Sequence, residues 1–312
     1  VMWERVSVTF KLKSPLHIGY IPFKGSVVSP TRYYVLGRNL WGAITKKITE
    51  ELYQEPIGDN YRLIGTHVAE AFRFSYFYVY DGETVYLPEF TEEGLKYGDD
   101  KKKITVSAFE KKFVGSRIST AIDEISYTAK QESLHEIEFI NDSFKDESGC
   151  LRGVKIAGCI WCKKGAVIDG KEIVYSNEGI FIDDFNIIEE LILGGESKYG
   201  FGHVMMDTVN KVKVFEKVNQ IHEDSNDGKL KVTIKEGSSL LAHFEYSKNL
   251  NFRGDIELLS GRGYFYPDAK ERSDRPGKVI SKPEYYFSPG TVFVDRCNVT
   301  AEVCWDGTMR AV

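Results

Sequence analysis

The stretch LGGESKYGFGH, residues 193–203, places four glycines around one lysine, and the elements predicted on either side of it decide the fold class. Apolar residues at 185–193 share one face of a predicted helix, and residues 203–214 predict a strand. Glycines let a chain approach a phosphate closely with successive N–H groups turned toward it, and Lys198 adds positive charge. A helix end followed by a turn is the simpler explanation of the same residues. A dinucleotide-binding loop is excluded, because that loop follows a strand and precedes a helix.

The elements upstream of this loop extend the pattern. Residues 5–13 (RVSVTFKLK) alternate apolar and polar side chains, which predicts a half-buried strand. A helix with one apolar stripe is predicted at about 38–53. Further strands are predicted at 33–35, 68–79, 84–88 and 151–163. The order strand, helix, two strands, helix, strand across residues 4–215 is that of the ferredoxin-like fold, so we predict an α+β protein with a ferredoxin-like core.

The chain divides into two predicted regions. Its 312 residues suffice for two folded units or one large one. Residues 1–218 hold the ferredoxin-like unit, with an insertion of short strands and extended loops at about 91–149. After a polar connector, residues 219–312 are β-rich, and a second, degenerate ferredoxin-like unit is one interpretation of them.

Composition excludes several classes of protein. Asp and Glu number 46 against 41 Lys and Arg. The net charge of -5 argues against a protein that coats nucleic acid nonspecifically, but it does not exclude a local basic groove. The sequence has no run of about 18 apolar residues, which excludes a membrane-spanning helix, and it begins without a signal peptide, so we expect a cytoplasmic protein. The 18 Tyr and 19 Phe favour β structure and, as the less common explanation, stacking on bases.

Four segments are similar to the motifs of one family. They are SPLHIG (14–19), YVLGRNLWGAIT (34–45), the glycine-rich stretch and FSPGTVF (287–293). In this order they resemble the first-strand exit, the helix entry, the glycine-rich loop and a late strand entry of the RAMP superfamily, the CRISPR-associated RNA-binding proteins. The resemblance covers the frame of residues 5–215 and, more weakly, the tail.

The resemblance implies a function in antiviral defense. RAMP proteins recognise CRISPR RNA, and those of the type III Csm and Cmr complexes assemble as subunits along the guide. The implied partners are therefore CRISPR RNA and the other subunits of a type III effector complex, with no membrane. The residues implied to bind RNA lie in the glycine-rich stretch, beside the first helix and in the insertion: Gly194, Gly195, Lys198, Gly200, Gly202, Arg32, Arg38 and Arg117. For Arg38, a solvated surface position is the alternative.

Other candidates come from the residues themselves. The loop from Gly261 to Lys282 interleaves basic residues, beginning with Arg262, with aromatic ones, as single-strand binders do, and a solvated loop is the equal alternative. Asp123 either orients Arg117 or caps a turn, and the turn is favoured. The pair Cys159 and Cys162 lies in a strand-like run, which favours buried small side chains over zinc ligands.

The sequence also bears on catalysis. The target-cleaving subunit of the family carries an aspartate in the loop after its first strand, but residues 20–32 (YIPFKGSVVSPTR) contain no carboxylate. We therefore expect a non-catalytic structural subunit without metal or cofactor. The alternative is a metal-independent endoribonuclease that processes guide precursors with His17, His135 or His203. A nucleotide- or protein-binding module that shares the fold is a third, weaker hypothesis.

Overall fold

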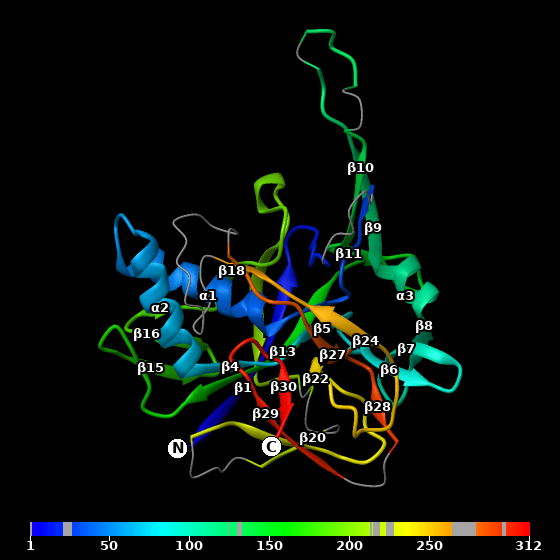
Figure 1. The fold of residues 1–312 in the computed structure, drawn as a ribbon. Coiled ribbons are helices and arrows are strands. Elements are labelled where there is room, and N and C mark those ends of the chain that lie inside the picture. The colour runs from blue at the N-terminus through cyan, green and yellow to red at the C-terminus, as the bar shows by residue number, and fades with distance from the viewer. Residues whose placement is uncertain are drawn as a thin grey trace.

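The computed structural model describes residues 2–20, 27–123, 125–129, 133–212, 214, 219–222, 228–263, 279–294 and 298–312. Within them the chain is mostly strand with few helices, which confirms the predicted α+β class. Figure 1 shows a body of packed sheets and helices from which one long hairpin projects. Among the described residues, no helix is long and apolar enough to cross a membrane.

A central antiparallel sheet organises the first two thirds of the chain. Its inner strands lie in the order β19–β1–β13–β5, with β18 and β3 at the edges and β4 also paired to β13. Strand β1 covers the predicted stretch, and its even-numbered residues from Val6 to Leu12 are buried. The bounds are β1 (Trp3–Leu12), β3 (Tyr34–Val35), β4 (Phe72–Phe74), β5 (Phe77–Tyr80), β13 (Lys155–Lys163), β18 (Glu190–Ile192) and β19 (His203–Val209).

Two helices, α1 (Gly37–Leu52) and α2 (Gly58–Ala71), connect β3 to β4. The first confirms the predicted helix, since Leu40, Ile44 and Ile48 are buried along one stripe. The second corrects the strand predicted at 68–79. The first four residues of that range end α2, because Ile64 and Val68 lie one helical turn apart on its buried face.

The helix predicted at 185–193 is wrong. The chain between β13 and β19 instead forms the strands β14 (Val167–Ile168), β15 (Lys171–Ser176), β16 (Gly179–Ile182), β17 (Phe185–Asn186) and β18. Leu191 and Leu193 are buried while Glu190 and Ile192 are exposed, which is a period of two. A short apolar run fits both the helical period of 3.6 residues and the strand period of two. Pairing of β18 with β19 selects the strand. The glycine-rich stretch is therefore the loop of a β-hairpin, not a helix end.

The insertion forms small sheets, one helix and a projecting hairpin. Residues 91–149, predicted as an insertion, contain short strands as expected and also the helix α3 (Val106–Phe113), which was not predicted. We call residues 114–140, which contain the hairpin β9–β10, the finger (Figure 1). The strands are β2 (Val28–Ser29), β6 (Leu87–Thr91), β7 (Gly94–Gly98), β8 (Lys103–Thr105), β9 (Val114–Ser119), β10 (His135–Ile140), β11 (Ser143–Lys145) and β12 (Leu151–Gly153).

The C-terminal region lies against one face of the central sheet. Its seven-stranded sheet has the order β20–β21–β29–β30–β22–β27–β24. Arg73 and Tyr78, which face the same side of the central sheet, donate hydrogen bonds to the carbonyl oxygens of Val303 and Leu241. The bounds are β20 (Asn219–His222), β21 (Lys231–Ile234), β22 (Phe244–Glu245), β23 (Phe252–Arg253), β24 (Ile256–Leu259), β25 (Arg262–Gly263), β26 (Val279–Ile280), β27 (Glu284–Phe287), β28 (Val292–Phe293), β29 (Val299–Val303) and β30 (Met309–Ala311).

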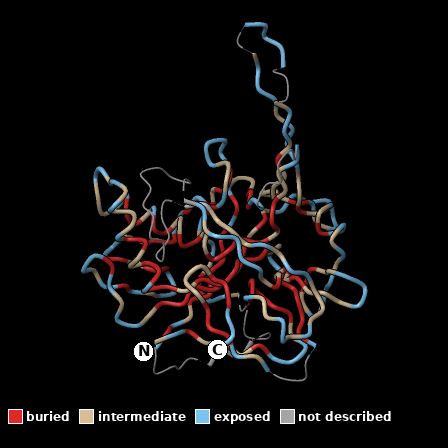
Figure 2. Tube along the Cα trace, in the orientation of Figure 1, coloured by how far each residue is buried: buried red, intermediate tan, exposed pale blue. Residues whose placement is uncertain are grey.

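This packing buries part of the aromatic content. Tyr34, Tyr76 and Tyr78 lie buried between the central sheet and the C-terminal region. Figure 2 shows buried chain through the body and exposed chain along the finger. The commoner explanation of the aromatic residues, a β-rich core, therefore holds for these three tyrosines, which cannot stack on bases.

Candidate nucleic-acid interface

Residues 14–19 join the glycine-rich loop to the base of the finger. Leu16 exchanges backbone hydrogen bonds of 2.9 Å with Ile140 in β10. On the other side, the amides of Gly195 and Gly202 donate to the carbonyl oxygens of His17 and Pro15 at 2.9 and 2.8 Å. Three segments that the sequence singles out separately thus form one surface region.

The glycines shape the loop between β18 and β19. Gly194 and Gly202 have φ angles of +77° and +84°, and a Cβ atom there would lie 2.2 Å from the carbonyl oxygen of His17 and 2.0 Å from that of Leu193. Only glycine fits both the conformation and the space. The amides of Gly195, Gly200 and Gly202 all donate within the protein. These amides are therefore not turned toward a phosphate. The part of the loop that can contact a ligand is its tip.

The tip of the loop is a cation beside an aromatic ring. Lys198 and Tyr199 lie in a single turn of 3-10 helix (Ser197–Tyr199), and both are exposed. Glu196 and Gly200 on either side adopt left-handed backbone conformations, which turn the chain back on itself. A lysine and a tyrosine held next to each other can bind a phosphate and stack on a base.

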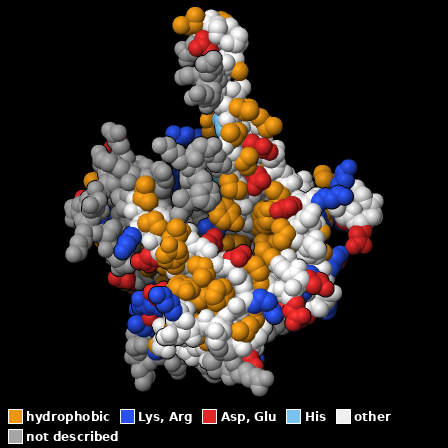
Figure 3. Space-filling view, turned by 45° about the vertical axis from the view of Figure 1, so that its right-hand side comes forward, with side chains coloured by type: hydrophobic (Ala, Val, Ile, Leu, Met, Phe, Trp, Pro, Cys, Tyr) orange, Lys and Arg blue, Asp and Glu red, His pale blue; other side chains and the backbone are white. Residues whose placement is uncertain are grey.

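The finger carries an exposed cation and exposed apolar side chains. Arg117 lies on β9 and is exposed, and the side chains of Ile118, Ile122, Ile125, Tyr127 and Leu134 are all more than half exposed. Hydrophobic side chains are visible along the finger in Figure 3. Asp123 accepts hydrogen bonds from the amides of Ile125 and Ser126, which supports the turn rather than a role in orienting Arg117.

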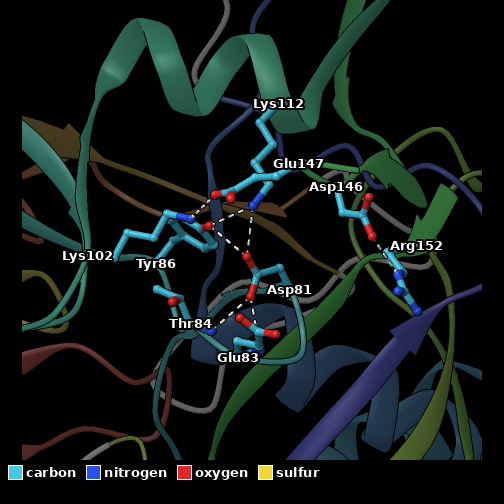
Figure 4. A network of polar contacts seen from close by, with 9 residues as sticks. All are labelled: Asp81, Glu83, Thr84, Tyr86, Lys102, Lys112, Asp146, Glu147 and Arg152. Carbon is cyan, nitrogen blue, oxygen red and sulfur yellow. Dashed lines mark hydrogen bonds and ion pairs between the residues drawn. The ribbon is translucent and has the colours of Figure 1, made fainter. Parts of the chain in front are cut away.

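A polar cluster lies at the foot of the finger. Lys112, in the last turn of α3, donates hydrogen bonds of 2.8 Å to both Asp81 and Tyr86 (Figure 4). Burial opposes ionisation of Asp81, but hydrogen bonds from Lys112, Thr84, Tyr86 and Glu83 outweigh it and keep the pKa of that carboxyl below its usual value. Because β9 begins two residues after Lys112, this cluster ties the finger to the turn that follows β5.

Arg32 is not available to RNA. Its side chain is only 3% exposed, and its guanidinium donates to both carboxylate oxygens of Glu257 at 3.0 Å. Behind Glu257, the fully buried His243 bonds to Glu257 through Nε2 and to the hydroxyl of Tyr76 through Nδ1. The predicted phosphate contact of Arg32 is therefore replaced by an ion pair that joins the core to the C-terminal region. Nothing in the sequence pairs these distant residues.

Arg38 lies at the start of α1, as predicted, but the helix end is covered. A Cβ atom at Gly37 would lie 2.7 Å from the backbone oxygen of Asp306, so the C-terminal turn packs directly on this N-terminus. Arg38 lies 4.0 Å from the Asp306 carboxylate and over the ring of Trp305. The helix end is therefore covered by the protein's own chain, whereas Arg38 is half-buried beside it, and its contact with RNA stays a prediction.

The remaining candidates are placed as follows. His17 is buried and its Nδ1 lies 2.7 Å from the carbonyl oxygen of Glu138, which supports a role in local packing. His135 is exposed beside the carbonyl oxygen of Ser133, and His203 contacts the Glu190 carboxylate at 2.5 Å.

The cysteines and the basic loop complete the list. Cys159 and Cys162 are free and buried in β13, and burial raises the pKa of Cys162. Among the described residues, no group of three or more His, Cys, Asp or Glu is arranged to hold a metal ion. Arg262 begins β25, but its side chain lies outside the described residues. So do residues 264–278, which make up most of the predicted basic loop.

Comparison with known proteins gives one informative result. No family model matches the sequence, and no curated protein matches it. A chain in the cryo-EM structure of the Type III-B Cmr-beta bound to cognate target RNA and AMPPnP is 13% identical, with a TM-score of 0.50 over 93% of this chain and 86% of that chain. This protein has the fold of a Cmr-beta chain. The predicted likeness to a type III subunit is therefore confirmed at the level of the fold.

A second Cmr-beta structure, bound to cognate target RNA, gives a similar alignment. There the identity is 12% and the TM-score 0.47, again over 93% of this chain and 86% of the other. At such identities the comparison concerns the fold, and residue roles must come from the geometry described above.

Proposed function

We propose that this protein binds CRISPR guide RNA as a non-catalytic structural subunit of a type III effector complex, with a ferredoxin-like RAMP core. The order β19–β1–β13–β5, entirely antiparallel, supports that core. In this interpretation the first crossover holds α1 and α2, and strands β14 to β18 replace the second helix. The absence of a carboxylate from residues 20–32 of the sequence supports a subunit that does not cleave target RNA.

The observation that carries the proposal is the joining of the glycine-rich loop to the finger through residues 14–19. The loop offers Lys198 and Tyr199, and the finger offers Arg117, all exposed. Phosphates bind cations without regard to sequence, and bases stack on an exposed ring, which suits a subunit that holds a guide by its backbone. We therefore propose Lys198, Tyr199 and Arg117 as RNA contacts, with the four glycines as positioning residues.

The test is binding of labelled CRISPR-repeat RNA to the purified chain, with and without magnesium. We expect a gel shift without cleavage, and weaker binding to all RNA sequences for Lys198→Ala and Arg117→Ala with unchanged folding. Each lost phosphate contact should also lower the slope of log affinity against log salt by about 0.7. The matched control is Lys46→Ala, an exposed helix lysine paired with Glu50.

Two results would overturn the proposal. Unchanged affinity in both variants would remove the loop and the finger as RNA contacts. Cleavage that persists in chelator would favour the guide-processing endoribonuclease, with His203 and its partner Glu190 as the first residues to replace.

A further inference from the structure

The C-terminal region covers only part of one face of the central sheet. Along that face, Tyr78, Ala157 and Thr9 are cross-strand neighbours, and all three are fully buried or nearly so. The next row on the same face is Tyr80, Lys155, Lys11, Met205 and Glu190, in register across β5, β13, β1, β19 and β18. We call these five residues the open row, because each is exposed or half exposed.

The open row continues into a second, shorter row toward the glycine-rich loop. The amide of Lys13 donates to the carbonyl oxygen of His203, and His203 lies opposite Ile192. Lys13 lies one residue beyond the end of β1, and this backbone hydrogen bond holds it beside β19. Because His203 directly follows Gly202, the two rows lead from the middle of the sheet to the loop that carries Lys198.

The charges of this surface are unevenly compensated. Lys155 is paired with Asp207 at 2.7 Å, and His203 with Glu190 at 2.5 Å. Lys11 and Lys13 are exposed, and within the described part of the chain neither has a carboxylate within 4 Å. Among the described residues, the surface thus offers two ammonium groups without a carboxylate partner, beside the paired Lys155 and the carboxylate of Glu190, which contacts His203.

Apolar contact area lies beside these free cations. Met205, directly opposite Lys11, is 39% exposed, and Ile192, opposite His203, is 45% exposed. The ring of Tyr80 is half exposed, and its hydroxyl donates to the carbonyl oxygen of Gly82 at 2.6 Å, which holds the ring in place. Since neighbouring strands lie about 4.8 Å apart, five strands span about 19 Å.

We propose that the open row, together with Lys13 and His203, is a binding track for single-stranded RNA. Lys11 and Lys13 contact phosphates, while Tyr80 and Met205 contact base faces. Free cations next to an ordered ring and exposed apolar side chains are what a single strand requires, because its bases are unpaired and its backbone is fully charged. This inference rests on the proposed function and adds a surface outside the loop and the finger.

The test compares RNA affinity of the full chain carrying Lys11→Ala and Lys13→Ala with that of a control carrying Lys46→Ala and Lys171→Ala. Of the control lysines, Lys46 is exposed and Lys171 half-buried, and they are paired with Glu50 and Asp183. With labelled CRISPR-repeat RNA, we expect the open-row double variant to bind at least about tenfold more weakly near 0.1 M salt, and its salt slope to fall by about 1.4. The control should bind like the unaltered chain.

Two further variants separate RNA contact from a general loss of structure. Tyr80→Ala should weaken binding, whereas Tyr80→Phe should retain it, because the ring remains. Glu190→Gln should strengthen binding by about twofold, since it removes a negative charge from the track. If this surface had only a structural role, Tyr80→Ala and Glu190→Gln would not change RNA affinity in opposite directions.

The outcomes distinguish this inference from the function on which it rests. If Lys198→Ala weakens binding but the open-row variant matches the control, the track is wrong and the proposed function stands. If the open-row variant alters self-association instead of RNA affinity, the surface binds protein and the inference is overturned. If the unaltered chain binds no RNA, both fail.

Discussion

The ring of Phe139, at the base of the finger, packs edge-on against the ring of Phe201 in the glycine-rich loop, with centroids 5.3 Å apart and planes at 66°. Phe201 is buried, so this contact is part of the packing between the glycine-rich loop and the base of the finger. It joins the two segments that carry the exposed residues Arg117 and Lys198. The positions of those two cations relative to each other therefore depend on an aromatic pair that is more than 60 residues apart in sequence.

We expect the Phe139–Phe201 pair to couple the stability of the finger base to that of the loop. In a double-mutant cycle with Phe139→Leu and Phe201→Leu, the coupling energy should be about 0.5 to 1.5 kcal/mol. Urea denaturation of the two single variants and the double variant measures it. Strict additivity would mean that the loop and the finger are held independently.

Glycine substitutions should divide into two groups. Gly194→Ala must adopt a left-handed conformation and also place its Cβ against the carbonyl oxygen of His17. Gly200→Ala meets only the conformational cost, since nothing lies within 4 Å of its Cβ. We expect Gly200→Ala to lose about 1 kcal/mol of unfolding free energy and Gly194→Ala distinctly more, as measured by urea denaturation. Equal losses would contradict the close packing of the loop on residues 14–19.

The alternation in residues 5–13 was sufficient to predict β1, and the stripe from Leu40 to Ile48 was sufficient for α1. Prediction failed where a short apolar run fitted two periods, at 185–193. It also failed at α2, whose last four residues, 68–71, were predicted to begin a strand. Pairing with β19 and packing against α1 decide these cases, and neither is visible in a local pattern.

The candidate site was predictable in part. Motifs located the glycine-rich loop, residues 14–19 and the insertion. Arg32 was assigned to RNA but binds Glu257 instead, and Arg38, assigned likewise, lies 4.0 Å from Asp306. Those carboxylates lie more than 200 residues away, so no spacing rule connects them. Lys11 and Lys13 were overlooked, although their spacing of two in a predicted strand places them on one face. Whether that face is free depends on how far the C-terminal region extends.

The two lysines of Figure 4 should differ in their effect on stability. Lys112 bonds to Asp81 and Tyr86 and lies over the rings of Phe113 and Phe144, whereas Lys102 bonds to Glu147, which is 92% exposed. Lys112→Met should cost about 1 to 3 kcal/mol, because it keeps the aliphatic packing but leaves Asp81 short of a donor. Lys102→Met should stay within about 0.5 kcal/mol. Equal values in denaturant titrations would show that the cluster does not hold the foot of the finger.

The ion pair between Glu257 and Arg32 should make stability depend on pH in the acid range. Burial opposes ionisation of Glu257, but the hydrogen bond from His243 and the charge and hydrogen bond of Arg32 outweigh it and lower the pKa of that carboxyl from 4.5 to about 2. A depressed carboxyl pKa stabilises the fold above the unfolded value and loses that contribution as pH falls. The unfolding free energy should therefore decrease by about 3 kcal/mol between pH 4.5 and pH 2 through this group.

The matching variant isolates that contribution from the other carboxylates. Glu257→Gln keeps the shape of the side chain but leaves the buried guanidinium of Arg32 without a counter-ion, so it should be less stable than the unaltered chain at pH 7 by about 3 kcal/mol or more. Its stability should then fall less steeply below pH 4.5, and the two curves should approach each other toward pH 2. Parallel curves would show that folding leaves the pKa of Glu257 unshifted, so that its charge contributes no net stability. The join between the core and the C-terminal region would then rest on packing and on neutral hydrogen bonds such as that from Tyr78 to Leu241.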